Sequence, residues 1–101
     1  MMKFERIMGI QVTDDDLYQK YREAMLPILT EYGGFFGYDF KVSQVLKAKT
    51  NEPINRVFTI EFQSQEVMDA FFSDADYLAV KNKFFNPSVT SVTVISLHEK
   101  I

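Results

Sequence analysis

The chain has 101 residues, of which 47% are hydrophobic and 25% charged, and its formal net charge at pH 7 is −3. This size and composition predict one globular domain over residues 1–101, large enough to bury a core. The chain has no Cys, which excludes disulfides and thiolate chemistry and favours a cytoplasmic location. Because Lys and Arg are spread along the sequence and no apolar run could span a bilayer, neither nucleic acid nor a membrane is expected as a partner.

The first third of the chain predicts a strand followed by a long helix. Apolar and polar side chains alternate over residues 3–12, as in a strand with one buried face. Thr13 is a candidate helix cap, with Asp16 completing a capping box. Pro27 lies within the apolar helical stripe and predicts one bent helix, with two shorter helices as the alternative. Gly33-Gly34 predicts the end of this helix.

The middle of the chain predicts two strands joined by a turn. Residues 35–48 alternate between apolar and polar side chains, which places Tyr38 on the buried face and Asp39 on the other. Residues 50–53 form a turn because they include Asn and Pro. A third strand is expected over residues 55–63.

The last third predicts two helical segments and a final strand. Ser64 can cap a short helix, and Ser73 with Asp76 repeats the capping-box pattern at the start of the next one. Asn86-Pro87 ends this second segment. The final strand, over residues 89–97, is apolar on both faces, which is typical of a strand covered on both sides.

The resulting order, β-α-β-β-α-β, predicts a ferredoxin-like α+β fold with a four-stranded antiparallel sheet and two helices on one face. The other face is expected to be open and of mixed polarity, so it either faces water or packs against a partner. The doubly apolar last strand favours a partner, in the form of a homodimer. The open face should carry Ile7, Gly9, Gln11, Asp39, Lys41, Ser43, Val57, Thr59 and Glu61.

Two long stretches resemble a bacterial domain family of unknown function, numbered 1330. VTDDDLYQKYREAMLPILTEYGG is similar to the family's first helix, with its mid-helix Pro and final Tyr-Gly-Gly. NRVFTIEFQSQEVMDAFFSDADYLAVKNKFF resembles its second half, in which a strand ends in Glu-Phe and a Ser-Asp-x-x-Tyr segment opens the last helix. The residues that match recurring family positions are Tyr21, Gly33, Gly34, Phe62 and Tyr77.

The resemblance implies a dimeric α+β barrel, in which two ferredoxin-like sheets pack face to face. That superfamily includes cofactor-free monooxygenases, haem-degrading enzymes and isomerases, while the family itself has no settled activity. The chain departs from the family at Phe84, where relatives tend to have an Arg. If that Arg binds an anion in relatives, the ligand of this chain differs from theirs.

No motif in the sequence predicts a metal site, a cofactor or nucleophilic catalysis. Asp14-Asp15-Asp16 could suggest a cation site, but no calcium-loop spacing follows, and acidic residues at a helix start interact favourably with its dipole. Asp74 and Asp76 have the same interpretation. We therefore expect neither a metal nor a cofactor.

Arg6 and His98 form one candidate anion-binding corner. Arg6 shares the helix-facing side of the first strand, and an antiparallel last strand would bring His98 near it. The alternatives are an Arg at the edge of the core, with its charged end in water, and an exposed His in the C-terminal tail.

Four tyrosines fall on core-facing positions: Tyr18, Tyr21, Tyr38 and Tyr77. Their hydroxyls could converge on a cavity and orient a flat ligand, or they could be core residues with their tips at the surface. Two hypotheses follow, a small-molecule-binding protein and a cofactor-independent monooxygenase- or isomerase-like enzyme acting on a small, possibly aromatic substrate. The candidate ligand-binding residues are Arg6, Tyr18, Tyr21, Tyr38, Tyr77 and His98.

Overall fold

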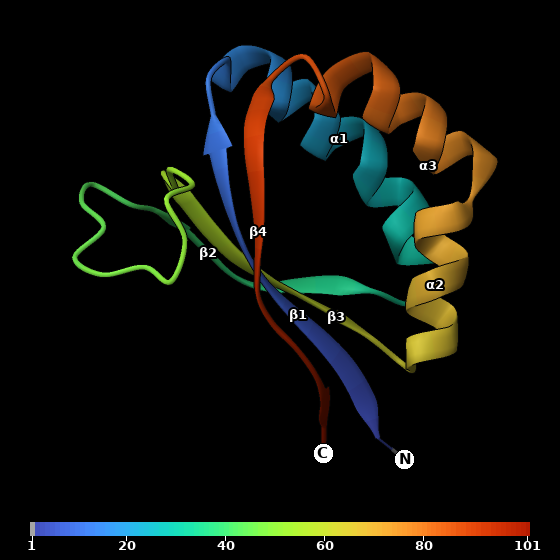
Figure 1. Ribbon diagram of the computed structural model, residues 1–101. Coiled ribbons are helices and arrows are strands. Elements are labelled where there is room, and N and C mark those ends of the chain that lie inside the picture. The colour runs from blue at the N-terminus through green and yellow to red at the C-terminus, as the bar shows by residue number, and fades with distance from the viewer. Residues whose placement is uncertain (1) are drawn as a thin grey trace.

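The computed structural model describes residues 2–101 and shows one antiparallel sheet with its helices packed on one face (Figure 1). The strand order is β2-β3-β1-β4, so the first and last strands lie side by side. This arrangement confirms the predicted ferredoxin-like fold, with the second helical region divided into segments. The elements in chain order are β1 (Lys3–Val12), α1 (Asp15–Glu31), β2 (Phe35–Lys41), β3 (Arg56–Phe62), α2 (Gln65–Ser73), α3 (Ala75–Val80), the π-helical turn η1 (Lys81–Phe85) and β4 (Val89–Lys100).

Carboxylate and hydroxyl side chains cap the helices. Asp14, not Thr13, caps α1, because its Oδ1 accepts a hydrogen bond from the backbone N–H of Leu17 at 3.0 Å. Asp74 replaces the expected Ser73 at α3 in the same way. A carboxylate accepts the orphan N–H groups and also interacts favourably with the helix dipole, which explains both one-residue shifts. Ser64 caps α2 as predicted.

The long helix α1 is a single helix that includes Pro27, which confirms one helix rather than two. The helix ends at Glu31, shortly before Gly33 as predicted, and the φ of Gly33, 73°, is the left-handed conformation that glycine adopts without strain. The backbone N–H of Gly34 then bonds to the carbonyl of Leu29, which satisfies one of the last carbonyls of the helix.

A bulge in β2 exchanges the two faces of that strand. The register passes from Phe36 opposite Ile60 to Asp39 opposite Phe58, so β2 holds an extra residue that β3 does not match. Asp39 therefore lies on the helix side of the sheet, and its expected place on the open face is wrong. Tyr38 was expected on the core-facing side, and this is also wrong, because it is 64% exposed.

The lengths of two strands also differ from expectation. β2 ends at Lys41 rather than at residue 48, and residues 42–55 form a loop that leaves the sheet (Figure 1). β4 runs to Lys100, so His98 belongs to a strand and not to a tail. The apolar residues of β4 are only partly covered, since Val94 and Leu97 are both about half exposed.

The core lies between the sheet and the helices and is rich in aromatic rings. Tyr77 packs between Phe71 and Phe72, with ring centroids 4.5 and 5.5 Å away. Among the helices of residues 2–101, none combines the length and hydropathy needed to cross a membrane. The buried hydrophobic residues are Phe4, Met8, Ile10, Val12, Tyr18, Tyr21, Met25, Leu29, Phe58, Ile60, Phe62, Met68, Phe71 and Tyr77.

Candidate functional site

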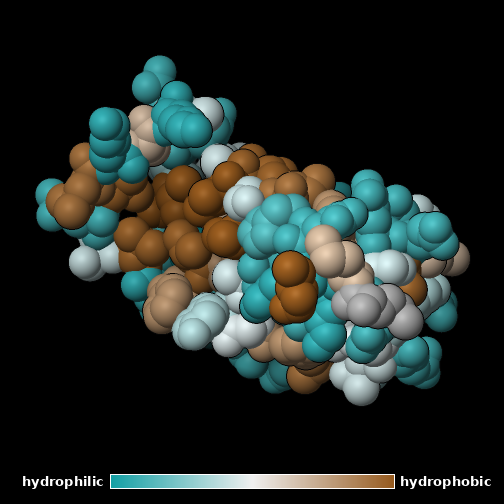
Figure 2. All heavy atoms as spheres, turned by 90° about the horizontal axis from the view of Figure 1, so that it is seen from below, coloured by the Kyte–Doolittle hydropathy of each residue, from teal (hydrophilic) through white to brown (hydrophobic). Residues whose placement is uncertain are grey.

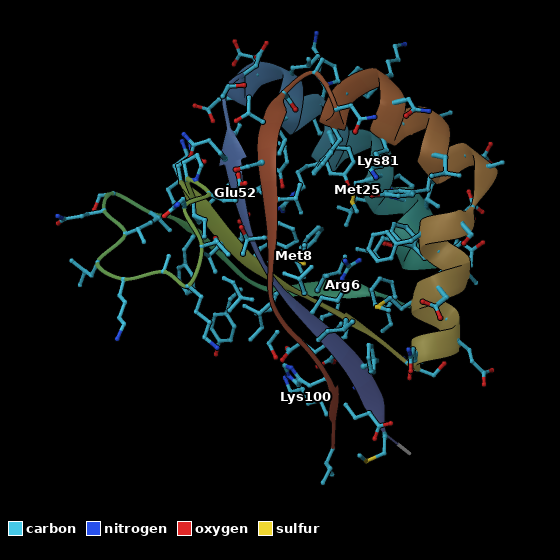
Figure 3. The ribbon with its side chains drawn as sticks, in the orientation of Figure 1. Arg6, Met8, Met25, Glu52, Lys81 and Lys100 are labelled. Carbon is cyan, nitrogen blue, oxygen red and sulfur yellow. The ribbon has the colours of Figure 1, made fainter. Side chains whose placement is uncertain are left out.

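A cavity of about 130 Å³ lies within the layer between the sheet and the helices. Figure 3 labels Arg6 and Met8 on the sheet and Met25 and Lys81 on the helices, on opposite sides of this space. Aromatic and aliphatic side chains make most of the wall, and a few polar groups interrupt it. The lining residues are Arg6, Met8, Ile10, Tyr18, Tyr21, Arg22, Met25, Phe36, Phe58, Ile60, Phe72, Tyr77, Lys81, Phe85 and Val92.

Arg6 reaches the cavity from the helix side of β1. Its guanidinium carbon lies 4.5 Å from the centre of the Phe72 ring, and its buried Nε has no hydrogen-bond partner. No carboxylate of residues 2–101 forms a salt bridge with it. Burial lowers the pKa of Arg6, against the influence of Tyr77, Asp69 and Tyr21, but an arginine stays protonated in proteins. The cavity therefore contains a cation with an unused donor.

Tyr21 of α1 and Tyr77 of α3 meet at the cavity wall through their hydroxyls, which are 2.9 Å apart. Both side chains are buried, and burial raises the pKa of both hydroxyls, so both stay neutral at pH 7. One hydroxyl donates to the other, and the proton of the accepting hydroxyl is left over. This second proton can be donated to a ligand.

The π-helical turn after α3 completes the wall. It places Phe85 against Tyr21, with ring centroids 4.9 Å apart, and against Tyr18 at 6.3 Å. A π-helical turn is an unusual backbone geometry that often marks a functional site. It also brings Lys81 to the cavity lining.

A second polar group closes one side of the cavity, and its donors are already engaged. Arg22 donates from Nε to the Tyr18 hydroxyl at 2.8 Å and from Nη1 to Asp39 at 3.2 Å. Arg56 donates to the same carboxylate at 2.7 Å. The Arg22 guanidinium also stacks over Phe36, 4.0 Å from the ring centre. These contacts fix Arg22 as part of the wall.

Burial alone would raise the pKa of the Asp39 carboxyl. The hydrogen bonds and charges of Arg56 and Arg22 outweigh burial and hold this pKa below its usual range. Asp39 is therefore a permanent anion near neutral pH, and it acts as a counter-ion for two arginines.

The structure brings together four of the six predicted ligand residues, namely Arg6, Tyr18, Tyr21 and Tyr77, around one cavity. Tyr38 and His98 are not among its lining. The predicted meeting of Arg6 and His98 is wrong, because the register sets Arg6 opposite Leu97 and Glu5 opposite His98, on the other face of the sheet. The His98 Nε2 atom lies 3.0 Å from Glu5 Oε1.

Sequence reasoning missed Arg22 and Lys81, and it considered Asp39 only on the open face. Arg22 was detectable as the i+4 neighbour of Tyr18 on a helix, a spacing at which side chains touch. The prediction put Asp39 on the wrong face because it did not include the bulge in β2. Lys81 has no distinguishing pattern in the sequence. Within residues 2–101 no group of three or more His, Cys, Asp or Glu side chains is arranged to hold a metal ion.

The open face of the sheet carries a cluster of charges at the end where the chain termini lie. Glu5 and Glu61 stand opposite each other on neighbouring strands and are only 9% and 5% exposed. Lys100 bridges them, with its Nζ 3.3 Å from Glu5 and 3.1 Å from Glu61. Lys3 lies 3.6 Å from Glu61, so each carboxylate has more than one partner.

The other end of the open face is an apolar hollow of about 650 Å³, between the sheet and the loop of residues 42–55. Figure 2 shows apolar side chains gathered there, beside the projecting loop. Leu46 on this loop is 89% exposed. The lining residues are Val42, Val45, Leu46, Lys47, Ala48, Lys49, Thr50, Ile54, Val57, Thr93, Val94 and Ile95.

Solved structures share this fold at low sequence identity. A protein of unknown function from Rhodopseudomonas palustris aligns with a TM-score of 0.78 and 15% identity, over 97% of this chain and 80% of that chain. A dabb family protein with a ferredoxin-like fold from Mesorhizobium loti aligns with a TM-score of 0.65 and 12% identity, over 100% of this chain and 97% of that chain. A putative antibiotic biosynthesis monooxygenase from Nitrosomonas europaea aligns with a TM-score of 0.65 and 12% identity, over 99% of this chain and 90% of that chain.

These similarities establish the fold and leave the reaction open. No curated protein gives a significant match to the chain. The model of a domain of unknown function, DUF1330, matches residues 6–96, which is nearly the whole chain. The chain therefore belongs to the DUF1330 family.

Proposed function

We propose that this protein binds a small molecule in the cavity between the sheet and the helices. The observation that carries the proposal is the convergence of unused donors from separate elements on one apolar space. Arg6 comes from β1, and the hydroxyl pair of Tyr21 and Tyr77 joins α1 to α3. Binding sites for small molecules typically combine such apolar walls with a few fixed polar groups.

The cavity lining suits binding better than proton abstraction. Within residues 2–101 it includes arginine, lysine and tyrosine but no carboxylate or imidazole side chain. Because burial raises the pKa of Tyr21 and Tyr77, their hydroxyls serve as donors and not as bases at neutral pH. The monooxygenase or isomerase alternative finds support only in fold similarity, which does not determine a reaction.

Methionine methyl NMR tests this site directly. Met8 and Met25 line the cavity, whereas Met68 is buried elsewhere in the core and serves as an internal control. Titration with benzyl alcohol, a neutral aromatic probe, should shift the methyl signals of Met8 and Met25 to saturation and leave Met68 nearly unchanged. Equal small shifts at all methionines, or no shift at the two cavity signals, would refute a binding site here.

We also propose that the protein forms a homodimer through the open face of its sheet. Tyr38 and Phe40 stack on each other there and are 64% and 55% exposed, and the apolar hollow lies on the same side. A monomer rarely leaves so much contiguous apolar surface in water. A second copy offers the same surface, which is how symmetric dimers pair.

Light scattering on the purified protein tests the dimer. The wild-type chain should have about twice its own mass of 11.8 kDa, and Phe40→Asp should reduce the mass to that of the monomer. Leu26→Asp is the matched control, because Leu26 is 48% exposed on α1, in the helix layer. A monomeric wild type, or dissociation by both variants alike, would contradict an interface on the open face.

A further inference from the structure

We infer that the ligand of the cavity is a small carboxylate with a single aromatic ring, whose carboxylate binds Arg6. The inference rests on the proposed binding function and narrows it to one chemical class. It follows from three features of the cavity, namely the sign of its charge, its size and the geometry of its donors.

The charge of the lining is positive. Arg6 and Lys81 both reach the cavity, and neither forms a salt bridge with a carboxylate of residues 2–101. Arg22 lines the wall too, but Asp39 and the Tyr18 hydroxyl already occupy its donors. Both side chains are half-buried, and the Asp69 carboxylate that acts on the charge of Arg6 is not within salt-bridge distance. Because a partly desolvated cation without a close counter-ion is costly, the site gains most from a ligand that brings a negative charge.

The size and walls of the cavity fit one aromatic ring. A cavity of about 150 Å³ lined by apolar side chains accommodates benzene, and this cavity measures about 130 Å³. Phe58, Phe72 and Phe85 line it, together with Met8 and Met25. Aromatic rings and methionine sulfurs make favourable contacts with a flat ring.

The donors match a planar, singly charged group. The guanidinium of Arg6 presents paired N–H donors in the geometry that a carboxylate accepts. The spare hydroxyl proton of the Tyr21–Tyr77 pair adds a further donor. The guanidinium carbon of Arg6 also lies 4.5 Å from the centre of the Phe72 ring, a cation–π contact that favours this position at the cavity wall.

Calorimetric titration of the full chain at pH 7 tests this assignment with three probes. Benzoate carries both the ring and the charge, benzamide carries the ring without the charge, and acetate carries the charge without the ring. Benzoate should bind at least tenfold more tightly than either of the others. Arg6→Gln should weaken benzoate binding roughly 10- to 100-fold, as expected for loss of a charge-assisted pair, and leave benzamide binding within about twofold.

Two further variants keep the test decisive. Arg6→Lys retains the charge without the paired donors and should bind benzoate with intermediate affinity, and it replaces Arg6→Gln if that variant does not fold. Lys20→Gln is the matched control, because Lys20 is exposed on α1 and forms no salt bridge within residues 2–101, and it should bind like wild type. Thermal melts establish that each variant is folded.

The outcomes separate this inference from the proposed function. If benzamide binds as tightly as benzoate, the carboxylate assignment is overturned while the cavity remains a binding site. If benzoate binds but Arg6→Gln and Arg6→Lys leave its affinity unchanged, Arg6 is not the anchor. If benzyl alcohol shifts Met8 and Met25 but benzoate does not bind, only the ligand class fails, whereas failure of both probes removes the binding site itself.

Discussion

The hydrogen bond between Tyr21 and Tyr77 makes the two buried hydroxyls depend on each other. Tyr21→Phe removes the partner of the Tyr77 hydroxyl, and Tyr77 is only 3% exposed, so water does not replace that partner easily. The substitution should therefore lower the free energy of unfolding by about 1–2 kcal/mol. Tyr77→Phe should have a similar effect. The double variant should lose less free energy of unfolding than the two single variants together, because no unpaired hydroxyl remains in it. Urea unfolding of the three variants measures these losses. Strictly additive losses would show that the bond contributes nothing.

Asp39 pairs with Arg22 of the cavity wall and with Arg56, and its contribution to stability should depend on pH. Since the pKa of the Asp39 carboxyl is lowered in the folded state, its contribution is complete above the unfolded value of about 3.9 and is lost as the pH falls through the folded value. Asp39→Asn should cost about 1–3 kcal/mol at pH 7.

Urea unfolding of Asp39→Asn and wild type at a series of pH values from 7 to 3 checks this prediction. The difference in unfolding free energy between the two proteins should shrink toward the acidic end. A difference that stays constant across the series would mean that the carboxylate charge plays no part.

At the scale of single residues, periodicity was enough to find part of the site. Tyr18, Tyr21 and Tyr77 repeat at helical spacing with the core residues, so sequence alone placed them on the inner face. Tyr38 and His98 were misplaced because their positions depend on strand register, which is set by a bulge in one case and by pairing between the ends of the chain in the other. A bulge moves the residues after it to the other face, and the alternation within a single strand does not reveal where a bulge lies or which residues of the partner strand it pairs with.

At the scale of elements, the bulge of β2 is supported by Gly37. A Cβ at this position would lie 2.6 Å from Thr59 Oγ1, and that oxygen accepts a hydrogen bond from the backbone N–H of Tyr38 at 2.8 Å. Gly37→Ala should therefore force Thr59 to rotate and break this bond, at a cost of about 1–2 kcal/mol. Thermal or urea unfolding gives the loss of stability.

Thr59→Ala tests the cause of that loss. In the Thr59→Ala background the oxygen is absent, so adding Gly37→Ala should cost clearly less than it does in wild type. An equal cost in both backgrounds would show that the glycine is needed for its backbone freedom and not for the space beside Thr59.

Most elements were predictable because their signals are local. Alternation identified β1 with its bounds, and a glycine ended α1 as predicted. The end of β2 was not predictable, because apolar and polar side chains continue to alternate past Lys41, after the chain has left the sheet. The apolar side chains of that stretch, such as Val45 and Leu46, line the open-face hollow instead of pairing as a strand. Leu46 is 89% exposed, so the alternation past Lys41 does not mark a buried strand face.

In the molecule as a whole, salt bridges of Lys100 connect the last strand to the first strand and to β3, near the two ends of the chain. The first and last strands are neighbours, and their paired ends bring Lys100 between Glu5 and Glu61 on the open face. Two mostly buried carboxylates directly opposite each other would repel, so the bridging ammonium has more effect here than in an ordinary surface salt bridge. The same cluster lies on the face that we propose to be the dimer interface.

Lys100→Met should therefore destabilise the protein, with a pH dependence of its own. Hydrogen bonds to Glu61 and Glu5 raise the pKa of Lys100 in the folded state. Its contribution is thus fully present below the unfolded value of about 10.4 and is lost as the pH rises through the raised folded value. Urea unfolding should show the largest difference between variant and wild type near pH 7 and a smaller one in strongly alkaline buffer. Lys20→Met, which removes an exposed lysine of α1, is the control, and an equal effect of the two substitutions would refute a bridging role for Lys100.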